Sequence, residues 1–188
     1  MKYFLIAISV GSCFFNLSVF SRQAQAGSFE ASAGFSFNRS RYSDDSYSWS
    51  RRWGSSLGYH FSDRTELEVA FQDIVDRTKI VGFEDTTFHD TIFSVNWVQG
   101  LVGKDWAVQP YVKVGVGQLN REATGSYANG VSPPTIVDSL TGILGAGARI
   151  YITRTFAIRT EVSSYLEGGK IKTWQQNIGV TAGLSYYF

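Results

Sequence analysis

The chain has 188 residues and a formal net charge of +1, from 17 basic and 16 acidic residues. This balance gives no electrostatic footprint for nucleic acid, so we expect no nucleic-acid partner. Aromatic residues, which favour strands, make up 15% of the sequence, and prolines number only 3.

The first 26 residues have the three-part pattern of a secretory signal peptide. Lys2 supplies a positive charge, an apolar stretch covers residues 3–20, and small residues at the −3 and −1 places of an A-x-A cleavage site end at Ala26. The alternative, a permanent membrane anchor, fits less well because a polar segment follows at once. We therefore expect residues 1–26 to be a cleaved signal peptide and residues 27–188 to form one exported domain.

The exported domain offers little metal or disulfide chemistry. Cys13 is the only cysteine and lies in the leader, so neither a disulfide nor a cysteine metal site is expected. His60 and His89 are far apart in sequence, which is a weak pattern for a metal site. We expect no metal and no cofactor.

Period-two alternation of apolar and polar residues dominates the exported domain and predicts strands with two unlike faces. Only Ile92 is out of pattern in the fourth segment. The alternating segments cover residues 28–38, 47–61, 66–72, 91–97, 106–117, 139–152, 156–163 and 174–188. Eight strands are an even number, as in single-chain bacterial outer-membrane barrels.

The connections between these segments alternate in length. Short or modest ones cover residues 62–64, 99–105 and 153–154, and longer ones cover 39–46, 73–90, 118–138 and 166–173. Short turns on one side and long loops on the other are typical of periplasmic turns and extracellular loops. The sequence therefore predicts an all-β fold, an eight-stranded antiparallel up-and-down transmembrane β-barrel with both termini on the periplasmic side.

Glycine placement indicates which face lines the interior. Glycine weakens an exposed strand, whereas inside a narrow barrel it leaves room for long neighbouring side chains. The glycines on the polar face are Gly34, Gly54, Gly58, Gly115, Gly117, Gly145, Gly147, Gly179 and Gly183. This favours a polar lumen and a lipid-facing apolar wall. The alternative is a soluble barrel, such as a lipocalin, with an ordinary solvated polar face.

The polar face also carries a balanced set of charges. Buried charges need partners, because their desolvation is otherwise too costly. The four basic and four acidic residues on this face are Arg52, Lys113, Arg149, Arg159, Glu30, Glu66, Glu68 and Glu161. We expect these eight side chains to form a paired lumen charge network, so that side chains rather than a wide pore occupy the interior. The lipid-facing set is almost free of charge, with Arg51 as the exception.

The C-terminal segment ends in an alternating aromatic pattern. Phe188 is the last residue, and Tyr186 and Leu184 share its face. Aromatic rings suit the headgroup level of a membrane. We expect Leu184, Tyr186 and Phe188 to form the signal that directs barrel assembly.

The sequence resembles the OmpA/OmpX-type family of eight-stranded, porin-like outer-membrane barrels over about residues 27–188. The resemblance rests on Leu184-Ser185-Tyr186-Tyr187-Phe188, Pro110-Tyr111 followed by Gly115-x-Gly117, Gly145-x-Gly147-x-Arg149-x-Tyr151, and Arg159-x-Glu161. It implies a monomer in the outer membrane of a Gram-negative bacterium. The implied partners are outer-membrane lipid, lipopolysaccharide, the barrel assembly machinery and periplasmic chaperones.

Two classes of function remain after this comparison. The first is a non-enzymatic barrel with a structural or surface-interaction role through its extracellular loops, and this is the function we expect, with no catalytic residues. The alternative is a lipid A-modifying enzyme of the acyltransferase or deacylase type. Residues 161–165, where a deacylase would carry its catalytic groups, contain no histidine, and His60 is expected at the periplasmic end of the lumen. His89 is expected near the outer end of its strand, where a loop serine could approach it.

Overall fold

The computed structural model describes residues 26–43, 45–103, 106–127, 130, 136–167 and 178–188. The predicted signal peptide lies outside these residues except for Ala26. The predicted start of the last strand at Trp174 also lies outside them. None of the described residues belongs to a helix long and apolar enough to cross a membrane.

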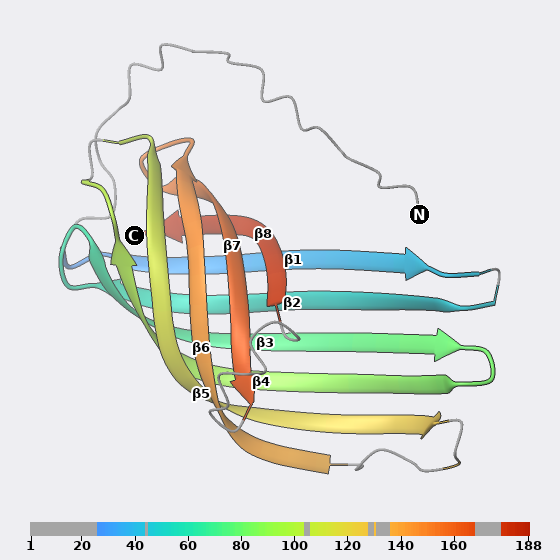
Figure 1. The fold of residues 1–188 in the computed structure, drawn as a ribbon. Coiled ribbons are helices and arrows are strands. Elements are labelled where there is room, and N and C mark those ends of the chain that lie inside the picture. Colours follow the sequence, from blue (N-terminus) through green and yellow to red (C-terminus); the bar gives the residue numbers. More distant parts are fainter. Residues whose placement is uncertain (1–25, 44, 104–105, 128–129, 131–135, 168–177) are drawn as a thin grey trace.

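Eight antiparallel strands form a closed barrel, which confirms the predicted fold (Figure 1). Each strand pairs with its neighbours in sequence, and β1 pairs with β8. The strands are β1 (Phe29–Arg41), β2 (Tyr47–His60), β3 (Thr65–Ile80), β4 (Glu84–Gly100), β5 (Val108–Tyr127), β6 (Ile136–Tyr151), β7 (Phe156–Glu167) and β8 (Ile178–Tyr187). The β1–β8 pairing runs from Glu30↔Tyr187 to Phe35↔Ala182, so over this height no sheet edge is left within the membrane, where an unpaired backbone could not bind water.

The strands on the outer side are longer than the sequence pattern predicts. The prediction of a loop over residues 73–90 is wrong, because β3 and β4 stay paired from Asp73↔Thr91 to Ile80↔Glu84. Only Val81–Phe83 connects them, and Gly82 takes the positive φ of 77° that a tight hairpin loop requires. β5 likewise extends to Tyr127, inside the predicted loop over residues 118–138. Above the membrane both faces of a strand meet water, so the apolar alternation ends while backbone pairing continues.

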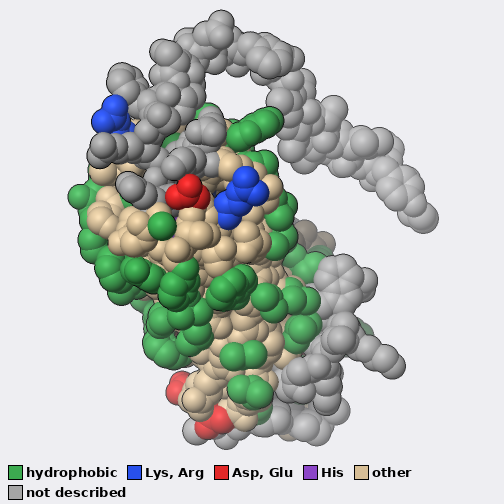
Figure 2. Space-filling view, turned by 90° about the vertical axis from the view of Figure 1, so that its left-hand side faces the viewer, with side chains coloured by type: hydrophobic (Ala, Val, Ile, Leu, Met, Phe, Trp, Pro, Cys, Tyr) green, Lys and Arg blue, Asp and Glu red, His purple; other side chains and the backbone are tan. Residues whose placement is uncertain are grey.

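The apolar set faces outward, as predicted. Hydrophobic side chains are spread over the wall seen in Figure 2. Phe35, Val95 and Val180 are among the exposed large hydrophobic residues, whereas the polar-face residues Glu30 and Glu68 are buried in the lumen. An apolar wall around a polar interior is the arrangement of a membrane barrel.

Aromatic rings gather at the inner end, where the β2–β3 turn and the C-terminus lie. Phe29 contacts Tyr59, with ring centroids 5.1 Å apart, and stacks on Phe188 at 5.8 Å. Phe156 contacts Tyr186 at 4.9 Å. The Phe29 and Phe188 backbones also exchange two hydrogen bonds, of 2.9 and 3.1 Å. The terminal residue therefore takes part directly in closing the barrel.

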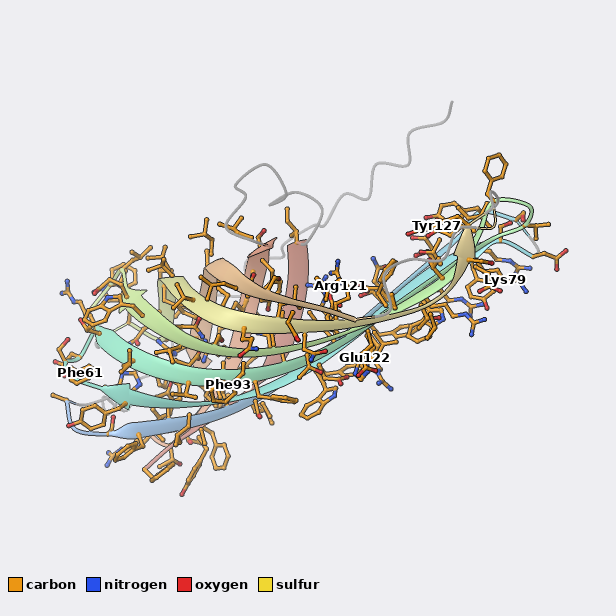
Figure 3. All side chains as sticks on the ribbon, turned by 90° about the horizontal axis from the view of Figure 1, so that it is seen from below. Phe61, Lys79, Phe93, Arg121, Glu122 and Tyr127 are labelled. Atoms are coloured by element: carbon orange, nitrogen blue, oxygen red, sulfur yellow. The ribbon has the colours of Figure 1, made fainter. Side chains whose placement is uncertain are left out.

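The outer end extends beyond the barrel wall as long hairpins. Figure 3 shows Phe61 at the inner end, with Lys79 and Tyr127 near the far tips of β3 and β5. Arg121 and Glu122 lie between, where the wall passes into the hairpins (Figure 3). Arg121 is half-buried and Glu122 is exposed, so neighbouring residues of one strand still face opposite sides at this height.

Candidate functional site

A network of buried charges occupies the inner half of the lumen. Period-two geometry points alternate side chains inward, and strand register brings those of several strands to the same height. The participating side chains are Glu30 of β1, Glu66 and Glu68 of β3, Lys113 of β5, Arg149 of β6, and Arg159 and Glu161 of β7, all of them buried.

Arg149 organises the layer nearest the inner end. Its guanidinium lies 2.9 Å from the Glu30 carboxylate and also pairs closely with Glu66. Ser185 of β8 donates a hydrogen bond of 2.7 Å to the same Glu30 carboxylate. The Nε2 atom of His60 lies 3.2 Å from Glu30 and 3.9 Å from Glu66. Charge-assisted hydrogen bonds of this kind are stronger than neutral ones, so this layer connects five strands of the barrel, β1, β2, β3, β6 and β8.

Arg159 organises the next layer. Its Nη1 atom lies 2.6 Å from Glu68 and its Nη2 atom 2.9 Å from Glu161. Lys113 pairs closely with Glu161 and lies 3.5 Å from Glu68. The Tyr111 hydroxyl donates to Glu161 at 2.9 Å and accepts from Arg159 at 2.8 Å. Each carboxylate in this layer therefore has at least two donors, the condition for a charge to be stable in a lumen.

The two layers form one connected network. Arg159 Nη1 reaches Glu30 of the inner layer at 3.5 Å. The Tyr111 ring lies between the two arginines, with guanidinium carbons 4.7 Å (Arg149) and 5.1 Å (Arg159) from its centroid. These distances are within the range of cation–π attraction.

The lumen glycines make room for this network, as predicted. A Cβ atom added at Gly58 would overlap the Glu66 carboxylate. One added at Gly147 would lie 2.4 Å from the Thr160 carbonyl oxygen and 2.5 Å from the Tyr111 ring and hydroxyl. The network therefore depends on glycine at these positions for space rather than for backbone conformation.

Arg52 lies apart from the other seven predicted members. Among the described residues it forms no ion pair, and its Nη1 atom is buried without a hydrogen-bond partner. His60 contacts the network instead, next to Glu30 and Glu66; the sequence reasoning placed it in the lumen but did not count it as a charge partner. Its signal was an inward position on β2 directly opposite Glu66.

An apolar cluster occupies the lumen on the outer side of the network, and the sequence reasoning missed it. The only sign was the break in alternation at Ile92. The cluster consists of Ile74, Ile92, Leu119, Ile143 and Tyr165, all of them buried. Farther out, Arg121 makes two hydrogen bonds to Asp90, of 2.7 and 2.6 Å. Side chains thus occupy the lumen at several successive heights.

A cavity of about 50 Å³ borders the network. Its lining includes the network residues Glu68, Lys113, Arg159 and Glu161 together with Arg52 and Gln72. A volume of this size has room for a few waters or one small polar group.

The metal-binding potential of the lumen is limited to one cluster among the described residues. Glu30, His60 and Glu66 each offer a ligand atom within 4.8 Å of the others. Both carboxylates already pair with Arg149, whose positive charge opposes a cation at that point. The expectation that no metal binds here remains a prediction.

His89 lies on the outer wall, not in the lumen. Its Nε2 atom is 2.6 Å from Asp73, which in turn lies 3.7 Å from Arg51. The residues paired with His89 across the sheet are Val75 on β3 and Glu122 on β5. Among the described residues, His89 therefore bonds to a carboxylate and to no serine.

The comparisons with known proteins agree with this architecture. A family model described as outer membrane protein beta-barrel domain matches residues 13–188. The search of curated proteins found no match to this sequence. Among solved structures, the chain is similar to the N-terminal β-barrel domain of Pseudomonas aeruginosa OprF, with 16% identity and a TM-score of 0.59, over 88% of this chain and 100% of that one.

Two further structures show the same fold. OprG from Pseudomonas aeruginosa has 15% identity and a TM-score of 0.53, over 89% of this chain and 98% of that one. Ail, the attachment invasion locus protein of Yersinia pestis, has 14% identity and a TM-score of 0.50, over 87% of this chain and 100% of that one. At these identities the likeness is one of fold.

Proposed function

The chain belongs to the outer membrane β-barrel domain family, and from this premise we propose that it is a non-enzymatic barrel with a side-chain-filled lumen and a surface role carried by its extracellular hairpins. The family and the fold place it in the outer membrane of a Gram-negative bacterium. Its stable wall would hold the hairpins at the cell surface.

The lumen network is the observation that carries this proposal. Arg149 and Arg159 contact acids contributed by β1, β3 and β7, so the ion pairs cross the interior rather than line it. An open channel would require these pairs to separate. Leaving a buried charge without its partner costs about 3–5 kcal/mol, which opposes a stable wide pore.

The outer hairpins support the surface role. Val81 and Phe83 at the β3–β4 tip are 61% and 72% exposed, and Tyr42 beyond β1 is 65% exposed. Exposed apolar groups on a polar hairpin are common at interaction sites. On the outer wall below, Arg51 and Arg77 provide basic groups at which lipopolysaccharide phosphates could bind.

Conductance of the purified barrel in planar bilayers tests the proposal directly. The expected result is no large, steady conductance. A stable open pore of porin size would refute the side-chain-filled lumen. A second assay addresses the enzymatic alternative: lipid A from cells with and without this protein is compared by mass spectrometry, and a mass change would overturn the non-enzymatic assignment.

A further inference from the structure

The seam between β1 and β8 closes only part of the barrel height. Their pairing runs from Glu30↔Tyr187 to Phe35↔Ala182 and ends there. Both strands continue: β1 extends to Arg41, and β8 begins at Ile178 and remains paired with β7 from that residue. In Figure 1, β8 bends away from the line of the straight β1. Residues 36–39 and 178–181 therefore face each other across the seam without pairing, although both segments are described.

Arg52 lies on the lumen side of this gap. It is the register partner of Ser36 on β1, and its guanidinium packs against Gly179 of β8, where an added Cβ would overlap Nη1. The Arg52 side chain thus extends from β2, past β1, to the segment of β8 that is not paired with β1. Its Nη1 atom is buried and has no hydrogen-bond partner. A buried donor without an acceptor is costly, so this position favours an acceptor, and an anionic one most of all.

The space beside Arg52 has the size of a small head group. The cavity of about 50 Å³ is lined by Arg52 and by Gly34, Thr181 and Gly183, the residues at the point where the seam opens. Gly34 and Gly183 are register partners, and a Cβ added at Gly183 would lie 2.0 Å from the Ala33 carbonyl oxygen, so the two backbones pack closely just before the seam opens. The Glu68 and Glu161 carboxylates also line the cavity, but Lys113 and Arg159 already pair with both, so their charges are compensated locally.

The lipid side of the gap is apolar. Phe35 and Phe37 on β1 are 54% and 58% exposed, and Val180 on β8 is 62% exposed. Phe37 stacks on Trp49 of β2, with ring centroids 6.4 Å apart. A molecule that crossed the gap would therefore meet a buried cation on its inner side and hydrocarbon on its outer side.

We propose that the open part of the β1–β8 seam binds a single-chain anionic amphiphile of the fatty-acid class. Its carboxylate accepts a hydrogen bond from Arg52 within the cavity, and its chain leaves between β1 and β8 to lie along Phe37 and Val180. The site requires the membrane barrel of the proposed function, but it lies beside the charge network. Conductance and amphiphile binding are measured separately, so either idea can fail alone.

The binding test uses dodecanoate labelled with ¹³C at the carboxyl carbon, added to the purified full barrel in a neutral detergent. The saturable part of the carboxyl NMR signal reports binding, and a gel-shift assay confirms that each variant is folded. We expect Arg52→Gln to weaken binding about tenfold or more, because a hydrogen bond between charged partners is lost. The matched control is Arg64→Gln, in the exposed β2–β3 turn at the inner end and away from the gap, which should leave binding within about twofold.

Two competitors test the chemistry of the ligand. Dodecanol keeps the chain without the charge, and butyrate keeps the charge without the chain; neither should displace dodecanoate at equal concentration. Equal displacement by dodecanol would overturn the role of Arg52, and equal displacement by butyrate would overturn the role of the seam. Absence of saturable binding to the wild-type barrel, or unchanged binding in a folded Arg52→Gln variant, would overturn the proposal as a whole.

A measurement on the wild-type barrel covers the case in which Arg52→Gln does not fold. Dodecanoate brominated along its chain should quench tryptophan emission saturably, since bromine quenches on contact and Trp49 lies beside Phe37. The quenched part of the emission should fall in Trp49→Phe, which keeps an aromatic ring on Phe37. It should disappear when Trp53, which lines the cavity and is the register partner of Phe35, is also changed to Phe. Saturable quenching that persists unchanged in the double variant would place the chain elsewhere and refute the site.

Discussion

Replacing Arg159 by methionine removes the centre of the lumen network while keeping most of the side-chain volume. The guanidinium is 2.6 Å from Glu68, 2.9 Å from Glu161 and 3.5 Å from Glu30. Without it, Glu68 and Glu161 share the single charge of Lys113. Breaking a buried pair from one side costs about 3–5 kcal/mol, which lowers the folding equilibrium constant by a factor of about 100 or more.

Urea unfolding in lipid vesicles, followed by gel shift, measures this cost. With a slope of about 1–3 kcal/mol per molar urea, the midpoint should fall by at least about 1 M. The matched control is Arg51→Met on the outer wall, where the 3.7 Å pair with Asp73 is half-exposed; such pairs contribute only about 0–1 kcal/mol. Adding Glu161→Gln to Arg159→Met should recover part of the loss, because it removes one of the uncompensated charges. If Arg159→Met and Arg51→Met shift the midpoint equally, the network does not stabilise the barrel as argued.

Three further predictions concern assembly, packing and chemistry. Deleting Phe188 should lower the amount of heat-modifiable protein in the outer membrane. Phe188→Tyr should have a much smaller effect because it keeps a ring at headgroup level. Cell fractionation measures both, and a normal outer-membrane level of the truncated protein would count against the assembly signal. Gly147→Val should destabilise the barrel by about 1–3 kcal/mol by overpacking Tyr111, while Ala146→Val on the lipid face should have little effect; equal unfolding midpoints would show that the lumen has spare room. His89→Ala should leave lipid A mass spectra unchanged, and a difference from wild type would reveal a catalytic role.

The course of the chain could be predicted where the membrane imposes a pattern. Within the bilayer one face of every strand meets hydrocarbon and the other meets the lumen, so alternation records each strand and its orientation. Beyond the bilayer this contrast disappears. The continuation of β3 and β4 to their tip at Gly82 was therefore invisible to the pattern, although backbone pairing continues there.

The sequence by itself determined the eight strands, the inward placement of the charged residues and the glycines that leave them space, because each of these depends on the two-residue period of a single strand. Only the tertiary structure decided which charges meet. Glu30 and Arg149 are 119 residues apart, and their contact depends on the stagger of strands around the closed barrel, which no local pattern records. The same stagger brings His60 into contact with the network and places Arg52 outside it, against Gly179 of β8. The sequence shows which residues are charged, but the partner of each charge depends on the height at which its strand places that side chain in the lumen.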